Sequence, residues 1–356
     1  MEARAYVTAF LERLYMAEHP DLTAAARELV HEEIPQRPEK YATSEHAQAL
    51  VSYLEVHERL IQELERIDEL PDAEFEQQRN RLFDEAREAF AQIARTDQLC
   101  VDAALVGTLL TNISIDSCIT ELLKLEQRVH EHLQRNVEGF DDEAPHFWDE
   151  RELERRAERE GHSADAAART MEEPEFIGWL HTLEALAQLC LASARYRAAE
   201  GYARTVLRAA GYPSRQEGTV FLVRARLEDD EGFFEFAHEL EATRPNEAAA
   251  LVDDSPWFLL GRTLLLYKTG RRRPAKRALR DFAARCEGGA FFLLNPTYMM
   301  PYLPVRPPAR EPWNLTHQAV WEADGIIVDT PDFAAWAESI EGIRESSEDF
   351  AHRYGF

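Results

Sequence analysis

The chain has 356 residues, of which 66 are acidic and 40 are basic, so its formal net charge is −26. An apolar fraction of 45% is sufficient for a folded core and argues against wholesale disorder. Because so much negative charge repels phosphate groups, we expect no general binding to nucleic acid or to anionic membranes.

The cysteines and the first residues bear on the cellular compartment. The four cysteines form no Cys-x-x-Cys pair, and three of them fall on apolar stripes of expected helices, which favours buried, reduced thiols (Cys100, Cys118, Cys190 and Cys286). Charged residues interrupt the first 20 positions, so they lack the apolar core of a signal peptide. No run approaches the roughly 18 apolar residues of a membrane span. We therefore expect a cytoplasmic protein.

Residues 1–137 have the spacing of helices. Apolar residues recur at steps of three and four over 45–68 and again over 74–95, and Pro71 separates the two stretches. Residues 99–111 predict a further helix, and Asp116 is the expected N-cap of the one that follows. The short turn between these last two helices predicts an antiparallel hairpin.

Residues 138–175 are dense in charge and poor in aliphatic side chains. Glu and Arg stand at helical spacing in the centre of this segment, so side-chain pairs three and four apart can support an exposed helix. We expect a solvated helix or a linker here. The alternative is a segment that recruits a basic partner.

A helical pattern then recurs after 34 residues. The segment that begins at Tyr196 places Ala199, Ala203 and Val206 at helical steps, and it ends at Gly-Tyr-Pro. Thirty-four residues later the same places hold Phe233, Ala237 and Leu240, and Pro245 follows. Upstream of each stretch lies another apolar helix, so each unit of the repeat is a pair of helices. A third unit, after about two extra residues, supplies Trp257, Leu260, Gly261 and Leu264, followed by Ala275, Leu279 and Phe282.

A period of 34 residues with two helices per unit resembles the tetratricopeptide repeat (TPR) family. The resemblance covers 176–290, about a third of the chain. It implies helical hairpins that stack side by side, because no single hairpin buries its own apolar stripe. The alternative is a set of unrelated amphipathic hairpins in a compact bundle.

The C-terminal region departs from this pattern. Residues 291–313 mix six prolines with aromatic residues and methionines, so they cannot form one helix, and we expect an extended strap over the groove or the end of the array. A helix from Thr316, ended by Gly325, and another that starts at Thr330-Pro331 then predict a capping hairpin. This order of features also resembles the soluble part of the suppressor-of-tumorigenicity-seven family, whose membrane segments are missing here.

The predicted fold is therefore all-α: a TPR-like, right-handed superhelical array (α-solenoid) with a Pro/aromatic strap and C-terminal capping helices. Its predicted parts are an N-terminal helical region (1–137), a charged linker or exposed helix (138–175), the TPR-like repeats (176–290), and the strap with its cap (291–356).

The sequence carries no recognisable catalytic, cofactor or metal motif. His130 and His132 are two residues apart on a helix and therefore point away from each other. The patterns HExxH, GxSxG, GxGxxG and the P-loop are absent. We expect no cofactor and no metal, and the abundance of carboxylates prevents any assignment of an acid and a base.

One stretch of this acidic chain is strongly basic. It holds seven cationic residues: Lys268, Arg271, Arg272, Arg273, Lys276, Arg277 and Arg280. One interpretation is an exposed helix face that neutralises nearby acidic helices. The other is a basic edge that recruits an acidic peptide or a phosphate group, since arginine offers planar bidentate donors.

The TPR resemblance implies a second surface, because the first helix of each repeat lines the concave groove in that family. Carried over position by position, the peptide-binding groove would hold His181, Glu184, Gln188, Arg215, Leu222, Arg226, Phe258 and Arg262. The resemblance further implies that three arginines from successive units clamp a peptide carboxylate. The alternative is ordinary polarity on exposed helix faces.

Together these patterns predict a non-enzymatic scaffold or adaptor that holds a peptide or helix of a partner protein in a concave groove. The leading alternative is an enzyme or ligand sensor with a pocket between the helical array and the 291–313 strap. A purely structural subunit of a larger complex is a third possibility. The sequence leaves the oligomeric state open.

Overall fold

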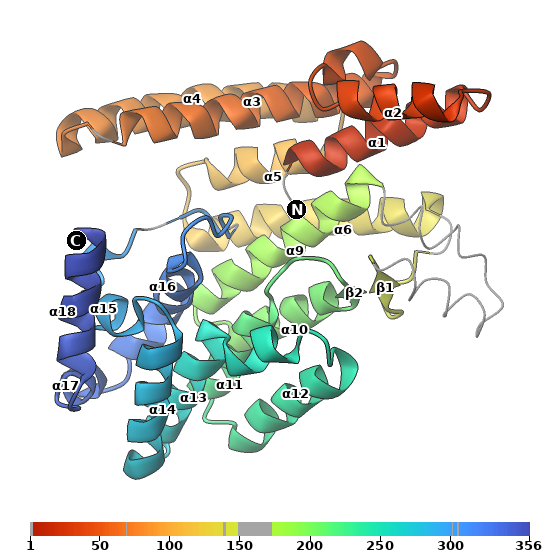
Figure 1. Ribbon diagram of the computed structural model, residues 1–356. Coiled ribbons are helices and arrows are strands. Elements are labelled where there is room, and N and C mark those ends of the chain that lie inside the picture. Colours follow the sequence, from red (N-terminus) through yellow and green to blue (C-terminus); the bar gives the residue numbers. More distant parts are fainter. Residues whose placement is uncertain (1–2, 69, 138–139, 149–172, 301, 305) are drawn as a thin grey trace. The chain divides into compact units, whose positions relative to one another are not determined.

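The computed structural model describes residues 3–68, 70–137, 140–148, 173–300, 302–304 and 306–356 (Figure 1). About 74% of the chain is helical, which confirms the all-α class. The chain divides into two compact units, Met1–Leu186 with Thr205–Ser214, and Ala187–Arg204 with Arg215–Phe356. This division differs from the four predicted segments: the 291–356 region belongs to the same unit as most of the repeats.

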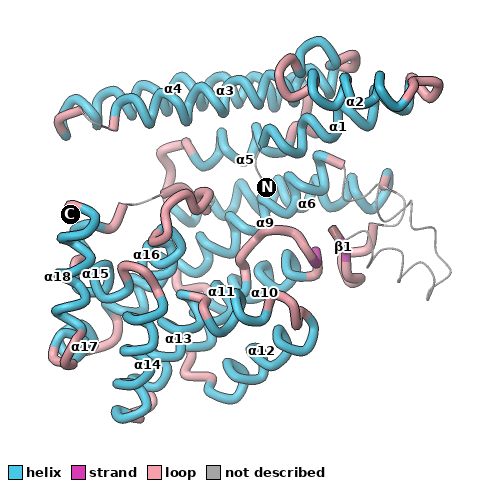
Figure 2. Tube along the Cα trace, in the orientation of Figure 1, coloured by secondary structure: helices cyan, strands magenta, loops and turns pink. Residues whose placement is uncertain are grey.

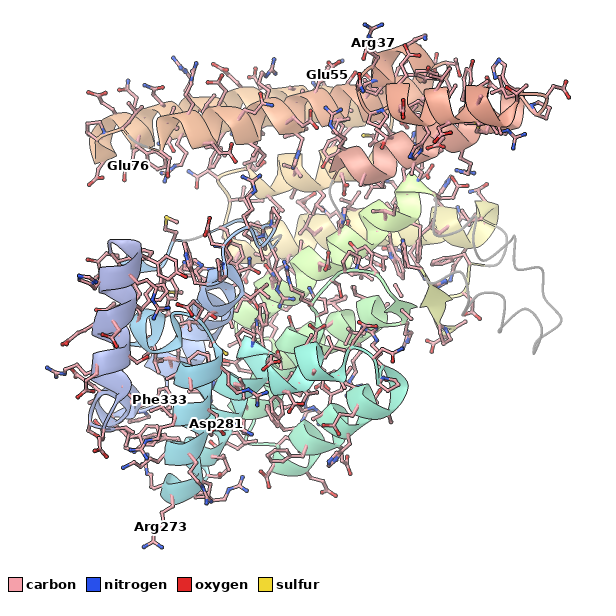
Figure 3. All side chains as sticks on the ribbon, in the orientation of Figure 1. Arg37, Glu55, Glu76, Arg273, Asp281 and Phe333 are labelled. Atoms are coloured by element: carbon pink, nitrogen blue, oxygen red, sulfur yellow. The ribbon has the colours of Figure 1, made fainter. Side chains whose placement is uncertain are left out.

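The first unit is built from long antiparallel helices. In chain order its elements are α1 (Ala3–Glu18), α2 (Ala24–Glu33), the 3₁₀ turn η1 (Pro38–Tyr41), α3 (Glu45–Ile67), α4 (Asp72–Thr96), α5 (Val101–Leu109) and α6 (Ile115–Asn136). Helix α3 packs on α1 and α4, α5 packs on α4 and α6, and exposed carboxylates such as Glu55 and Glu76 extend from the α3–α4 pair (Figure 3). The apolar spacing of these segments thus forms the predicted helices, because one stripe of each is buried against a neighbour.

The start of α6 differs from the prediction. Its N-cap is Ser114, whose hydroxyl accepts the amide N–H of Ser117 at 3.2 Å, while Asp116 lies inside the first turn. Either residue type can cap a helix. The extended backbone at Ser114 decides between them, since a cap residue lies outside the helical conformation.

A short parallel strand pair lies in the segment predicted as a linker or exposed helix. Strand β1 (His146–Phe147) pairs with β2 (Ala209–Ala210), in the register His146 to Ala209. The amide of Trp148 continues this pairing by donating to the carbonyl of Ala210 at 2.7 Å. The charged centre of the predicted exposed helix, residues 149–172, lies outside the described residues.

The second unit contains the hairpins and the C-terminal helices. Helices α9 (Pro174–Ala192) and α10 (Tyr196–Leu207) run across the boundary between the units. The others are α11 (Glu217–Arg226), α12 (Asp230–Thr243), the π-helical turn η2 (Ala249–Asp253), α13 (Pro256–Lys268), α14 (Arg272–Arg285), α15 (Gly289–Leu294), the 3₁₀ turn η3 (Pro296–Tyr298), α16 (Asn314–Val328), α17 (Phe333–Glu338) and α18 (Ile343–Tyr354).

Three successive hairpins share one turn geometry. Between their two helices Ala194, Glu228 and Gly270 take the left-handed conformation, with φ of 59°, 59° and 76°. In each turn the amide of the next residue donates to the carbonyl five positions before it, at 2.7, 3.0 and 2.9 Å. This is the Schellman pattern of a helix C-terminus. The recurrence of one turn is structural evidence for a repeating unit.

The buried stripes of the second helices are those that the sequence predicts: Ala199, Ala203 and Val206, then Phe233, Ala237 and Leu240, then Ala275, Leu279 and Phe282. Helix α11 packs on α12 and α13, and α13 packs on α14 and α16. The third hairpin is more displaced than predicted, because α14 begins 42 residues after α12. The turn η2 lies in the extra length before α13.

The strap is shorter than predicted. Residues 291–294 belong to α15, and the extended segment begins only after η3 (Figure 2). Helix α16 continues past Gly325 to Val328, and the last predicted helix is two short helices, α17 and α18, with Gly342 at φ +91° before α18. Thr330 is not an N-cap, since its hydroxyl donates to the carbonyl of Ile326 at 2.7 Å.

All four cysteines are unpaired and buried, as predicted. Burial raises the pKa of Cys286 to about 12, which keeps that thiol protonated at neutral pH. Within the described part of the chain, none of the helices is both long enough and apolar enough to cross a bilayer.

Candidate functional site

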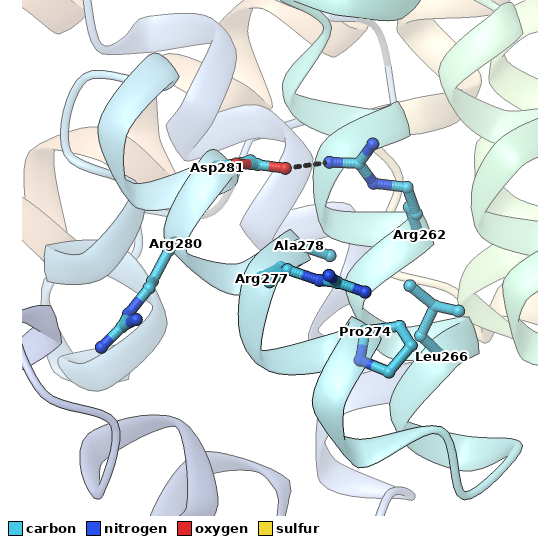
Figure 4. A pocket seen from close by; sticks show the side chains of 7 residues that line it. All are labelled: Arg262, Leu266, Pro274, Arg277, Ala278, Arg280 and Asp281. Carbon is cyan, nitrogen blue, oxygen red and sulfur yellow. Dashed lines mark hydrogen bonds and ion pairs between the residues drawn. The ribbon is translucent and has the colours of Figure 1, made fainter.

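The α13–α14 hairpin carries an open pocket of about 400 Å³ (Figure 4). It is called the arginine pocket below and is lined by Arg262, Leu266, Pro274, Arg277, Ala278, Arg280 and Asp281. Leu266 and Ala278 are buried, so they form an apolar base. The pocket therefore joins one residue of the predicted groove, Arg262, to two of the predicted basic patch, Arg277 and Arg280.

Arg262 is the best-fixed cation of this pocket. Its guanidinium lies 5.5 Å from the ring centroid of Phe258, and its Nη2 donates to the Asp281 carboxylate at 2.8 Å. The side chain is 24% exposed, and its Nε is buried without a hydrogen-bond partner. Because that donor is left unsatisfied, Arg262 retains capacity for another acceptor.

Arg277 and Arg280 differ in their surroundings. Arg277 lies across the pocket beside Pro274 and Leu266, and Arg280 points to the other side of α14 (Figure 4). Within the described residues Arg277 has no ion-pair partner, and Arg280 has only a 3.3 Å contact with the exposed Glu341. The pocket thus presents two cations, Arg262 and Arg277, over an apolar base, with Arg280 at its rim. Such a site suits a carboxylate joined to an apolar group.

The rest of the predicted basic patch falls into two groups. Lys268 donates to the carbonyl of Arg226 at 2.8 Å, Arg271 pairs with Asp230, and Arg272 lies over the ring of Tyr267. These three hold neighbouring segments together, as the neutralising interpretation requires. Arg273, which points outward from α14, and Lys276 have no such partner in the described chain and lie outside the pocket (Figure 3).

Four residues of the predicted groove are buried instead. They are His181, Gln188, Leu222 and Phe258. Phe258 packs on the rings of Phe221 and Phe233, while His181 and Gln188 make hydrogen bonds in the interior of their own units. Because their side chains are enclosed by neighbouring segments, we correct the assignment of these four to an open peptide-binding surface.

The three other groove residues have partners within the protein. Glu184 accepts the Tyr212 hydroxyl at 3.2 Å, and Arg215 donates to the carbonyl of Pro307 at 3.2 Å. Arg226 donates to the hydroxyl of Tyr196 at 3.2 Å, and it also pairs with an exposed aspartate of the C-terminal region. The arginine pocket includes neither Arg215 nor Arg226. The predicted three-arginine clamp is therefore not assembled there.

The strap is held by a buried ion pair that sequence analysis missed. Arg306 donates from Nε and Nη2 to the two carboxylate oxygens of Glu322 on α16, at 2.6 and 2.7 Å, and these side chains are only 4% and 5% exposed. Glu322 also accepts from Trp257 Nε1 at 2.8 Å, from the Tyr302 hydroxyl at 2.9 Å and from Gln188 at 3.4 Å.

This cluster, the Glu322 hub, occupies space that the alternative hypothesis gave to a ligand. Arg306 also donates to Thr219 at 3.0 Å and to the carbonyl of Arg215, so the strap places its own cation against α11. Its one sequence signal is a lone Arg in a proline-rich, apolar stretch, and that signal does not identify the partner.

A second buried polar network lies in the first unit. Asp102 of α5 accepts the hydroxyl of Tyr6 at 2.7 Å, and both of its oxygens lie 3.0 Å from His181 Nδ1. Burial by itself raises the pKa of Asp102. The charge of His181 and the hydrogen bonds from His181 and Tyr6 outweigh burial, and the pKa falls below its ordinary value. Burial, reinforced by Asp102, raises the pKa of Tyr6, which stays a donor. These links fix α1, α5 and α9 together.

A pH effect is expected where the strap begins. The amide of Met300 donates to His317 Nε2 at 3.0 Å, and burial lowers the pKa of His317 below 6.5. The folded state therefore binds fewer protons than the unfolded state, so this contribution to stability is lost as pH falls below about 6.5. We expect the free energy of unfolding to decline more steeply between pH 7.5 and pH 5.5 in the native protein than in His317→Gln. Urea unfolding at both pH values measures this, and parallel slopes would refute it.

Among the residues that the structure describes, no three His, Cys, Asp or Glu side chains are arranged to hold a metal ion. Comparisons with protein-family models, with curated proteins and with solved structures gave no match. The resemblances to the tetratricopeptide and suppressor-of-tumorigenicity-seven families stay predictions.

Proposed function

We propose that this protein is a non-enzymatic, cytoplasmic scaffold of TPR-like superhelical form, and that its arginine pocket holds an acidic segment of a partner protein. The repeated turn of the three hairpins and the buried, unpaired cysteines support the form and the compartment. The observation that carries the binding proposal is the position of Arg262 and Arg277 around one apolar base.

Electrostatics favour an acidic peptide at this place in particular. The chain as a whole carries a charge of −26, so its surface repels acidic segments in general. A local group of cations is then the place where such a segment can approach, since interactions between exposed charges fade over about 8 Å at physiological salt. Leu266 and Pro274 add apolar contact for the stem of a glutamate or for a neighbouring residue.

Asp281 makes the pocket selective. It now pairs with Arg262, so a peptide carboxylate has to compete with a carboxylate that is already in place. Asp281 is 53% exposed and can turn into solvent. A single weak anion gains little from this exchange. A segment with two or more carboxylates can engage Arg262 and Arg277 together, and it is favoured for that reason.

The test is a pair of charge reversals on one helix. A labelled eight-residue peptide with four glutamates should bind the native protein more weakly as salt rises, and Arg277→Glu should weaken binding by at least about tenfold. Arg273→Glu makes the same change of charge on α14 outside the pocket, and we expect it to have a much smaller effect. Fluorescence anisotropy measures both affinities, with a glutamine version of the peptide as the neutral probe.

Equal losses in Arg277→Glu and Arg273→Glu would show that only the overall charge matters, and the pocket would then be excluded. Undiminished binding of the glutamine peptide would exclude recognition of carboxylates. Circular dichroism of both variants checks that each is folded. Neither arginine has an ion-pair partner within the described chain, so we expect no loss of structure.

A further inference from the structure

A second pocket lies in the first unit, between helices α4, α5 and α6. Its volume is about 800 Å³, and small-molecule sites span roughly 300–1,000 Å³. Nothing in the proposed scaffold function uses it. It is called the α4–α6 pocket below.

Small side chains create the space in this pocket. Ala91 of α4 and Ala104 and Gly107 of α5 contribute to its lining. A Cβ atom at Gly107 would lie 3.4 Å from the Cβ of Phe90, so α5 approaches α4 closely at this point. None of the lining residues between 103 and 111 is longer than threonine. The cavity is therefore left open by the sequence of α5, and a ligand can reach the helix surfaces.

The charge around this pocket is positive. Arg87 and Arg95 reach it from α4 and Arg128 from α6, while Glu88 is the one carboxylate of its lining. Arg87 shares an exposed aspartate one turn away, at 3.0 Å. Arg128 is exposed and makes no ion pair or hydrogen bond within the described chain. Three cations against one anion, in a chain of net charge −26, mark a local site for an anion.

The hydroxyl groups of the pocket define the rest of the ligand. Thr108 donates to the carbonyl of Ala104 at 2.8 Å, and Thr111 donates to the carbonyl of Gly107 at 2.9 Å. Their protons are thus already used, and their oxygens offer only acceptor lone pairs to a ligand. The arginines offer only donors. A ligand that satisfies both carries anionic oxygens at one end and O–H donors at the other.

We propose that the α4–α6 pocket binds a small phosphorylated, hydroxyl-bearing metabolite of the sugar-phosphate class. The guanidinium groups hold the phosphate, because a planar fork matches two of its oxygens. The threonine oxygens accept from the sugar hydroxyls. The repulsion expected from the acidic chain does not prevent this, since charges beyond about 8 Å are screened at physiological salt.

The experiment is calorimetric titration of the full chain with ribose 5-phosphate, glycerol 3-phosphate and ATP, and with ribose and inorganic phosphate as partial ligands. We expect saturable binding of at least one phosphorylated compound, more tightly than either partial ligand. Arg128→Gln and Arg95→Gln should each weaken it by about tenfold or more. Ala104→Met, which fills the pocket without a change of charge, should abolish it.

Arg81→Gln is the matched control, because Arg81 is an exposed arginine of α4 outside the pocket. Binding should persist in this variant. The proposal is overturned if none of the three phosphorylated compounds binds saturably. It is also overturned if inorganic phosphate binds as tightly as they do, or if Arg81→Gln weakens binding as much as Arg128→Gln. Circular dichroism of each variant confirms folding, and Arg128→Gln keeps the test sharp even if Ala104→Met perturbs the helix packing.

Discussion

Replacing Glu322 with Gln is expected to lower the free energy of unfolding of the second unit by about 3–5 kcal/mol. The substitution leaves the Arg306 guanidinium buried without its counter-charge, and it places an amide N–H₂ among donors from Trp257 and Tyr302. Burial alone lowers the pKa of Arg306, but the charge and hydrogen bonds of Glu322 raise it above its ordinary value, so Arg306 stays charged. Urea unfolding followed by circular dichroism measures the loss.

Two further variants separate this effect from a general loss of charge. Glu341→Gln removes a carboxylate that pairs with Arg280 but is 89% exposed, and we expect a change below about 1 kcal/mol. The double variant Glu322→Gln with Arg306→Gln leaves no buried charge unpaired, so it should recover part of the loss. If the single variant is as stable as the native protein, or the double variant is no better than the single, the Glu322 hub does not hold the strap.

Asp102→Asn is expected to have the second largest effect, a loss of about 3 kcal/mol in the first unit. The carboxylate is buried, and it joins Tyr6 of α1 to His181 of α9. An asparagine accepts from one of these donors, but its amide N–H₂ faces the other, and the charge beside His181 is gone. The exposed carboxylate Glu121, which pairs with Lys124 on one face of α6, supplies the control, since Glu121→Gln should change stability by well under 1 kcal/mol.

The pH dependence of this difference has a definite sign. Since the pKa of Asp102 is lower in the folded protein than its ordinary value of 3.8, the folded state binds fewer protons near that pH. The contribution of Asp102 is complete above about pH 4 and is lost as pH falls through the folded pKa. The gap in stability between the native protein and Asp102→Asn should therefore narrow at pH 3. A gap that is constant from pH 7 to pH 3 would contradict this.

Much of the helical structure could be predicted from local sequence. The apolar residues at steps of three and four became the buried stripes of the three hairpins, and the 34-residue period became a repeated turn between Ala194 and Glu228. Errors arose at helix ends, as at Ser114 and Gly325, where several residues can cap or end a helix. Local spacing determines the stripe, but the backbone outside the helix determines the cap.

The candidate site could be predicted only in part. Arg262 entered one predicted set and Arg277 another, and the packing of α13 on α14 placed them around one pocket. In the same way, nothing in the basic stretch distinguished Lys268, which is fixed by the carbonyl of Arg226, from Arg277, which has no described ion-pair partner. Seven cations of one sign look alike until their neighbours are known.

The sequence by itself thus determined the all-helical class, the buried faces of the hairpins, the unpaired cysteines and the acidic surface, because each depends on composition or on residues a few positions apart. Tertiary structure alone decided that Arg306 meets Glu322, that Asp102 meets His181 across 79 positions, and that β1 pairs with β2. The physical reason is that a polar side chain can be buried only where packing brings it a partner. That partner comes from whichever distant segment the hydrophobic faces place beside it.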